Sequence, residues 1–483
     1  MERTVILPAP AAFQFNGGGR VVKANCRAVL FLSLAAGVLG AQDIQVQSTT
    51  VAQLWKLDTP GMDTRTYAPA VQFLGIDASG LGYEGLTLHL FGWGRGDLAD
   101  ASLPGGKKGD GDLTYGYLRH RFATANAEIK AGRFAIHQTG GFEQVDGVSA
   151  QTDLKGGFTV SAFAGRPVHY GNLPAADRED YEFQRDFIFG TRVGYRVPKV
   201  GEFGVSYLQD GTKTAGDLDQ PSLYDFTRKQ VGVDLHVAPH ARFDLTGRTL
   251  FDVASHPETL PGLEDPSRVA EHDYNVSVKV VETVSVSGAF TERNFRAYFA
   301  GTTLPSLFRQ DERGKFNAYG GKVVWQAMDG LQVTADYRHT RRESYGDANR
   351  MGAEVRWLFS EKKLQTGFGF HRVDADDVLA PGAQMASYGL SHNELRAWAT
   401  YELRRYFASV DGIYQSFDDE ANPNLNGKSN AYEVVASLGW KPTENLKISG
   451  DLGVGSNPLF RTETRGLVRV EYRFGLGRKG GSK

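Results

Sequence analysis

The residue spacing most suggestive of site chemistry occurs in an asparagine-rich stretch of this 483-residue chain. Asn422, Asn424, Asn426 and Gly427, followed by Glu433, reproduce the ligand spacing of a calcium-binding loop. Neutral amides stand where such a loop carries carboxylates, and Glu433 falls in a segment with strand-like alternation. The sequence therefore favours a solvated turn over a metal site.

Motifs typical of enzymes are absent from the sequence. It contains no CxxCH, HExxH, GxxxxGK[ST] or GxSxG pattern. Gly92, Gly94 and Gly96 recur every second residue within a strand-like segment, which indicates one smooth face of a sheet rather than a phosphate-binding loop. The one cysteine, Cys26, excludes disulfides and a thiolate metal cage. We expect no catalytic activity, no cofactor and no metal.

Charged side chains at alternate positions of strand-like segments form the main candidate site. In residues 331–338, Leu331, Val333 and Tyr337 share one face, whereas Asp336 and Arg338 share the other. In a closed barrel such polar faces line a water-filled lumen. The predicted lumen-lining residues carry both signs: Arg242, Asp244, Arg248, Asp336, Arg338, Arg356, Glu394, Arg396, Glu402, Arg469, Glu471 and Arg473. A mixed wall predicts weak ion preference; the alternative is that these charges brace the wall.

The elements that would position these residues are β-strands. From residue 42 the chain alternates apolar and polar residues in segments of about ten, a period of two. A mean hydropathy of −0.35 does not argue against a membrane barrel, because only alternate residues of such strands face lipid. A soluble β-sandwich rarely sustains this pattern over so long a domain. We predict one all-β domain over residues 42–474 and a short basic tail over 475–483.

Connection lengths predict how these strands are joined. Counting back from the last strand, at about residues 464–474, links alternate between long and short as far as the first strand near Asp43. The short links fit periplasmic turns and lie at residues 441–444, 404–405, 360, 327–330, 282, 238–241, 198–201, 155–156 and 124–126. The long links fit extracellular loops and lie at residues 416–430, 373–390, 296–314, 254–270, 210–227, 167–186 and 96–110. This pattern predicts a transmembrane antiparallel up-and-down barrel of about 22 strands, in a range of roughly 18–24, with both termini in the periplasm.

The N-terminal region has the layout of a secretory signal. Arg20, Lys23 and Arg27 precede the apolar run 28–39, and small residues follow at Gly40 and Ala41. The run is too short for a membrane helix, which needs about 20 apolar residues. We expect an N-terminal extension and signal peptide over residues 1–41, removed on export, which leaves a cysteine-free mature chain.

Two segments resemble known outer-membrane barrels. Val470, Tyr472 and Phe474 alternate with charged residues near the C-terminus, which resembles the final strand that such barrels present to their assembly machinery. Residues 127–168 carry Gly132-Arg133, a short glycine-rich loop and residues 146–148, Asp-Gly-Val, which would open the next strand. This stretch is similar to porin-like and alginate-export-type barrels and to the barrel component of porin–cytochrome conduits. The resemblance implies a bacterial outer-membrane channel.

Three functions fit these expectations. A loop-constricted passive channel is the first, with outer-membrane lipid and the barrel-assembly machinery as partners and no nucleic acid. The second is a sleeve for a multihaem cytochrome that contacts periplasmic and extracellular partners, because a barrel of about 22 strands has a backbone diameter of about 44 Å and needs filling. Strand-like sequence begins soon after the expected cleavage point, so long loops or another protein would fill the lumen. Surface adhesion by long acidic loops is the third.

Overall fold

The computed structural model describes the strands and most of the turns of the chain. The described residues are 43–58, 64–99, 109–138, 141–168, 187–211, 228–253, 269–294, 315–342, 346–359, 363–376, 390–418, 425, 427–458 and 461–477. Most of the predicted long loops lie outside them, as do residues 1–42 with the predicted signal peptide. In the described part, no helix is long and apolar enough to cross a membrane.

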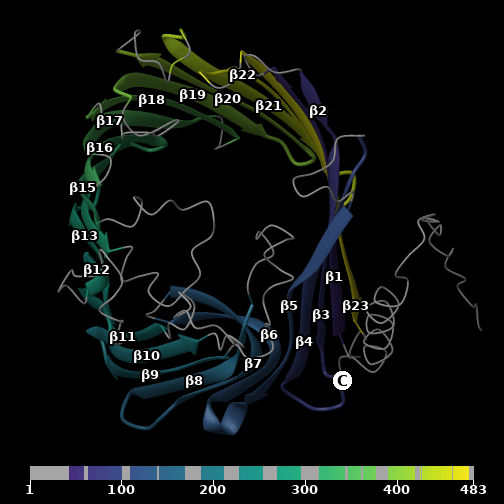
Figure 1. Cartoon of the computed structure of the whole chain (residues 1–483), viewed down its shortest axis with the longest axis vertical. Helices are drawn as coiled ribbons and strands as arrows, with labels where there is room; N and C mark the ends of the chain where they lie inside the picture. The colour runs from purple at the N-terminus through teal and green to yellow at the C-terminus, as the bar shows by residue number, and fades with distance from the viewer. Residues whose placement is uncertain are drawn as a thin grey trace, which may run out of the picture.

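Antiparallel strands make up almost the whole described chain (Figure 1). In chain order they are β1 (Asp43–Asp58), β2 (Arg65–Tyr67), β3 (Pro69–Ser79), β4 (Leu86–Asp97), β5 (Gly109–Phe122), β6 (Ala127–Gln138), β7 (Gly141–Asp153), β8 (Phe158–Pro167), β9 (Phe187–Val197), β10 (Gly201–Gly211), β11 (Arg228–His240), β12 (Phe243–Asp252), β13 (Val269–Val281), β14 (Val284–Asn294), β15 (Lys315–Met328), β16 (Leu331–Arg342), β17 (Gly346–Phe359), β18 (Leu364–Ala375), β19 (His392–Glu402), β20 (Tyr406–Phe417), β21 (Asn430–Trp440), β22 (Leu446–Ser456) and β23 (Thr462–Gly477).

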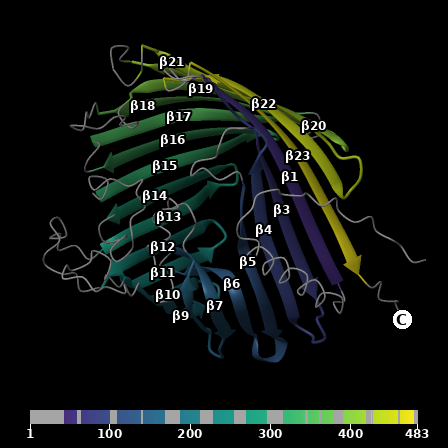
Figure 2. The same ribbon diagram turned by 45° about the vertical axis from the view of Figure 1, so that its right-hand side comes forward.

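The sheet closes on itself because the first strand pairs with the last. β1 pairs with β23 from Asp43↔Gly477 to Asp58↔Thr462, and with β3 on its other edge. β2 also pairs with β1 and is separated from β3 only by Ala68, so the two form one interrupted strand. The result is a closed antiparallel barrel of 22 strands, which confirms the predicted fold class and strand number. Figure 2 shows β23 and β1 side by side where the ring closes.

Side chains alternate between two faces of this wall. On β16 and β17, Tyr337 and Met351 are opposite each other and are 41% and 50% exposed. The intervening positions carry Asp336, Arg350 and other polar residues. We call these the apolar face and the charged face, and the same division continues around the ring.

Turns gather at one end of the barrel, as the sequence predicts. Residues 329–330, 282–283 and 441–445 each join neighbouring strands directly. The opposite end is less regular than the alternation of link lengths predicts, because only residues 343–345 separate β16 from β17. The two residues 139–140 between β6 and β7 fit the short glycine-rich loop predicted there. Two boundaries also differ from expectation. Residues 146–148 lie in the middle of β7 rather than at its start, and β23 continues to Gly477, past Phe474, because it follows β1 to its first residue.

Candidate functional site

One cluster on the charged face lies across β16 to β19. Asp336 accepts a hydrogen bond from Arg350 at 3.0 Å and lies 3.1 Å from the Nε2 atom of His371. The Nδ1 atom of His371 is 3.8 Å from Glu394, which is also 3.9 Å from Arg350. Gly352 stands directly opposite His371, and a Cβ there would lie 2.2 Å from the imidazole. The missing side chain makes room for the histidine, which is only 7% exposed.

A second cluster holds a buried carboxylate between two arginines. Glu271 on β13 is 0% exposed and accepts hydrogen bonds from Arg248 at 3.2 Å and from Arg293 at 2.5 Å. These arginines come from the two flanking strands, β12 and β14. Burying a carboxylate is costly unless it is paired, so both guanidinium groups are needed to keep Glu271 in the wall.

A third cluster lies on β9 to β11. Arg192 donates to Asp234 at 2.6 Å and to Glu202 at 2.9 Å, and Glu202 also accepts from Arg196 at 3.1 Å. Each cluster joins strands that are neighbours in the ring. The charged face is thus a series of cross-strand ion pairs rather than a ring of one sign.

The other predicted lumen residues are dispersed among these clusters. Asp244 lies 2.9 Å from His236, Arg356 donates to Gln365 at 3.0 Å, and Arg396 donates to Asp411 at 2.6 Å. Arg338 is opposite Arg350 in the β16–β17 register. On β23, Arg469 is 4.0 Å from Glu471, and Arg473 is opposite Gln47.

Two predicted residues lie at the turn end of the barrel instead. Arg242 precedes β12 and donates to Glu282 at 3.1 Å in the next turn. Hydrogen bonding from Lys279, and then from Arg242, lowers the pKa of the Glu282 carboxyl. Glu402 is the last residue of β19, with its side chain 68% exposed and 3.9 Å from Lys441. Alternation alone placed both on the wall, because it does not mark where a strand ends.

Sequence reasoning found Asp336 in the first cluster but missed one central residue in each of the three clusters. These residues are His371, Glu271 and Arg192. Each lies in a strand whose alternation of apolar and polar residues could be read from the sequence, for example at Phe370 beside His371. Phe368 and Phe370 are 55% and 44% exposed, so His371 belongs to the opposite face. That signal was available in the sequence, whereas the partners across strands were not.

The calcium-like spacing does not form a site among the described residues. Asn422, Asn424 and Asn426 lie outside them, whereas Glu433 belongs to β21 and forms an ion pair with Arg465. No group of three or more His, Cys, Asp or Glu side chains that could hold a metal occurs in the described part of the chain. Glu433 is therefore used in bracing the wall.

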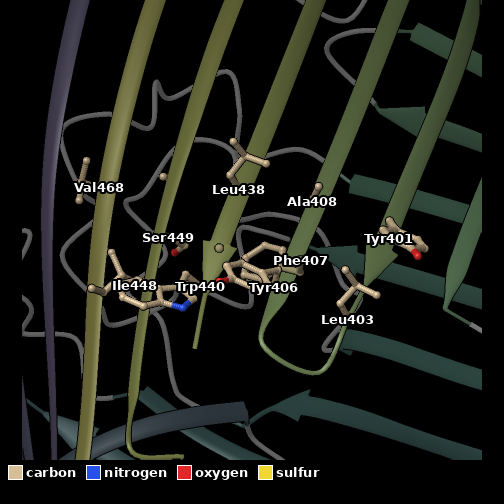
Figure 3. Close-up of a pocket in the computed structure, with 12 residues that line it drawn as sticks. Tyr401, Leu403, Tyr406, Phe407, Ala408, Leu438, Trp440, Ile448, Ser449 and Val468 are labelled. Atoms are coloured by element: carbon tan, nitrogen blue, oxygen red, sulfur yellow. The ribbon is translucent and has the colours of Figure 1, made fainter. Parts of the chain in front are cut away.

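Aromatic side chains border a groove on the apolar face near the turn end (Figure 3). The groove has a volume of about 490 Å³ and is lined by Tyr401, Tyr406, Leu438, Trp440 and Val468, among others. The strands of the opposite wall lie behind this part of the sheet in Figure 3. On the neighbouring β23, Val470, Tyr472 and Phe474 continue the same face, with Tyr472 43% exposed. Exposed aromatics near strand ends are typical of the interfacial girdles of membrane barrels.

Comparisons with known proteins bear on this fold. No family model matches the sequence, and no curated protein does. The ferric enterobactin receptor PfeA of Pseudomonas aeruginosa, solved as a mutant, superposes with a TM-score of 0.52 at 9% identity, covering 89% of this chain and 80% of that one. The siderophore receptor PirA of the same organism gives 0.51 at 10% identity, with the same coverage. The chain has the fold of the outer-membrane β-barrels. The outer-membrane protein opdK, also from Pseudomonas aeruginosa, gives a TM-score of 0.38 at 10% identity, covering 90% of this chain and 100% of that one.

Proposed function

We propose that this protein is an outer-membrane channel that passes small polar solutes passively through its lumen. The observation that carries the proposal is the division of a closed wall into an apolar face and a charged face. In a membrane the apolar face meets lipid, which leaves the charged face to line water inside the ring. The clusters around Asp336, Glu271 and Arg192 then belong to the lumen wall.

The balance of charge on that wall favours a channel with weak ion preference. Each cluster contains both signs, as in Arg192 with Asp234 or Arg248 with Glu271. A ring of one sign would select ions strongly, whereas the ion pairs on the described part of the wall carry both signs. The predicted signal peptide over residues 1–41 would deliver the chain to the periplasm for assembly.

The width of the barrel favours a constriction inside it. With 22 strands about 4.8 Å apart and tilted by about 40°, the backbone diameter is about 44 Å, far more than a small solute needs. We propose that long loops narrow the lumen, as the sequence predicts.

Liposome swelling tests the channel directly. Purified protein in liposomes should make them swell in isosmotic solutions of small neutral sugars and not of large oligosaccharides. The reason is that a loop-narrowed aqueous lumen sieves neutral solutes by size. Liposomes that show no swelling with any sugar would contradict passive passage.

The same width favours one alternative, a sleeve around a multihaem cytochrome. A lumen this wide accommodates far more than one helix of about 10–12 Å. Purification from native membranes distinguishes the two functions. A sleeve would come out coloured, with haem absorbance and a second protein, whereas a channel comes out colourless and alone.

A further inference from the structure

The groove on the apolar face of β19 to β23 follows from an alternation of side-chain size across the strands. One row of register partners carries large and small residues in turn: Tyr401, Ala408, Leu438, Gly450 and Val468. Ala408 and Gly450 leave two troughs between their larger neighbours, and both line the cavity of about 490 Å³. Because this face meets lipid, the troughs suit a flexible hydrocarbon chain.

A second row of side chains lies one step nearer the turns and closes the groove. Tyr406, Trp440 and Ile448 are register partners in this row, and Figure 3 shows them beside the turn that carries Leu403. Leu403 and Tyr406 are 42% and 56% exposed, and the backbone N–H of Leu403 donates to the carbonyl oxygen of Tyr406 at 2.7 Å.

The aromatic residues around the groove hold polar atoms that no described residue contacts. The phenol groups of Tyr401 and Tyr406 and the indole N–H of Trp440 form no hydrogen bond with the described part of the chain. Tyrosine and tryptophan with one such polar atom gather where hydrocarbon meets lipid head groups, and there they donate to head-group oxygens. The second row therefore marks the membrane interface.

Basic residues gather at the turns beyond this row. Arg404 and Arg405 form the tip of the β19–β20 hairpin, and the backbone N–H of Lys441 donates to the carbonyl oxygen of Arg405 at 2.7 Å. The side chain of Lys441 is 3.9 Å from Glu402, whereas both arginine side chains are exposed and pair with no described residue. The described residues at this end of β18 to β22 comprise four basic ones and two acidic ones: Lys363, Arg404, Arg405, Lys441, Glu402 and Glu444. Positive charge is thus in excess at the level of the head groups.

We propose that this groove and the adjoining hairpin tip bind an anionic phospholipid of the periplasmic leaflet. One acyl chain lies in the troughs at Ala408 and Gly450, and the head-group phosphate accepts hydrogen bonds from Arg404 and Arg405. Guanidinium groups match phosphate oxygens in geometry, and each basic residue near a membrane surface attracts anionic lipid by about 1 kcal/mol. The turns face the periplasm in the predicted topology, which is why the partner is a phospholipid.

Charge sets the preference among phospholipids. A zwitterionic lipid has the same phosphate, but its ammonium group is repelled by the two unpaired arginines. The site therefore favours a head group with a net negative charge. It lies on the outside of the wall, so it does not depend on passage through the lumen.

Native mass spectrometry of the purified full-length barrel in detergent tests the site. The probes are phosphatidylglycerol and phosphatidylcholine with identical acyl chains, each added in graded amounts. We expect phosphatidylglycerol to bind about tenfold more tightly, equivalent to about 1.4 kcal/mol. Equal affinities for the two lipids would overturn the proposal.

The double variant Arg404→Gln/Arg405→Gln should bind phosphatidylglycerol only as tightly as phosphatidylcholine. Lys155→Gln/Lys199→Gln is the matched control, since it removes two positive charges from the β7–β8 and β9–β10 turns across the ring (Figure 1). The control should keep the tenfold preference. A preference that survives in the arginine variant, or that is lost equally in the lysine variant, would overturn the site.

Filling a trough tests where the acyl chain lies. A Cβ built at Gly450 has its nearest contact at 3.5 Å, so Gly450→Leu places a side chain in the groove without a backbone clash. This variant should bind both lipids several-fold more weakly. Gly288→Leu on β14 is the control, because a Cβ there also has its nearest contact at 3.5 Å, and it should leave both affinities unchanged. Unchanged affinities in Gly450→Leu would show that the lipid does not occupy the groove.

Discussion

At the scale of single residues, carboxylates that each contact two basic side chains stabilise the charged face. Asp336 lies between Arg350 and His371, and Glu271 lies between Arg248 and Arg293. Such sharing serves the proposed channel in two ways. It fixes neighbouring strands in register, and it leaves the wall with charges of both signs rather than a single-sign field.

Removing the buried carboxylate should destabilise the barrel strongly. Glu271→Ala leaves Arg248 and Arg293 without their shared partner, and breaking a buried pair of this kind costs about 3 kcal/mol or more. Urea unfolding in lipid vesicles measures the change in the free energy of unfolding. Glu402→Ala, at an exposed strand end, is the control and should change it by less than about 0.5 kcal/mol. Equal effects of the two substitutions would contradict the role given to Glu271.

Neutralising the cluster on β16 to β19 should shift ion selectivity. Asp336→Asn/Glu394→Gln removes two negative charges beside Arg350, so the reversal potential in a salt gradient should move toward anion preference. Arg242→Gln changes a turn residue and should leave the reversal potential unchanged. A reversal potential that moves with Arg242 and not with the pair would place the conducting path elsewhere.

At the scale of the strands, the sequence predicted more than it did for the site. Alternation revealed the strands because lipid and water impose opposite demands on successive residues, as at Tyr337 and Asp336. The ends of strands were less readable, so Arg242 was assigned to the wall although it lies in a turn. Ion pairs such as Arg350 with Asp336 could not be predicted, because pairing depends on register, which shifts at irregular points such as Leu250 and Phe251.

The place where β5 and β6 part predicts a glycine requirement. Their ladder runs only from Gly116↔Arg133 to Phe122↔Ala127, and Gly132, with a φ of 127°, lies where it ends. Gly132→Ala forces a Cβ against the carbonyl oxygen of Gly116 at a φ unfavourable for alanine, and should destabilise the barrel by about 1–3 kcal/mol in urea unfolding. Gly466→Ala is the control, because nothing lies within 4 Å of a Cβ built there. A Gly132 variant as stable as the Gly466 variant would show that β5 and β6 part for another reason.

At the scale of the whole molecule, closure by β1 and β23 explains why a chain rich in charge can cross a membrane. Pairing along all of β1 leaves no free edge at the point where the two ends of the barrel sequence meet. Only the apolar face then meets lipid. The fold comparison with PfeA and PirA agrees with this architecture, although those chains share only 9–10% of residues with this one.

Such closure predicts a heat-modifiable outer-membrane protein. The folded barrel should resist detergent at room temperature, migrate faster than its boiled form on gels, and fractionate with the outer membrane. Cys26 belongs to the predicted signal peptide, so the mature protein would carry no cysteine of its own, and a cysteine introduced by mutation could be labelled specifically. Recovery in the soluble periplasmic fraction, with one migration position before and after boiling, would contradict a closed membrane barrel.

Single-channel recording in planar bilayers tests the central claim most directly. The sample is the purified barrel, colourless and free of other proteins, because the channel account requires no partner. We predict steady ohmic conductance with a reversal potential close to zero in a salt gradient, as a wall of mixed charge such as Arg192 with Asp234 implies. A membrane-inserted barrel that stays closed at all voltages, and conducts or carries electrons only after a haem protein is added, would contradict the account.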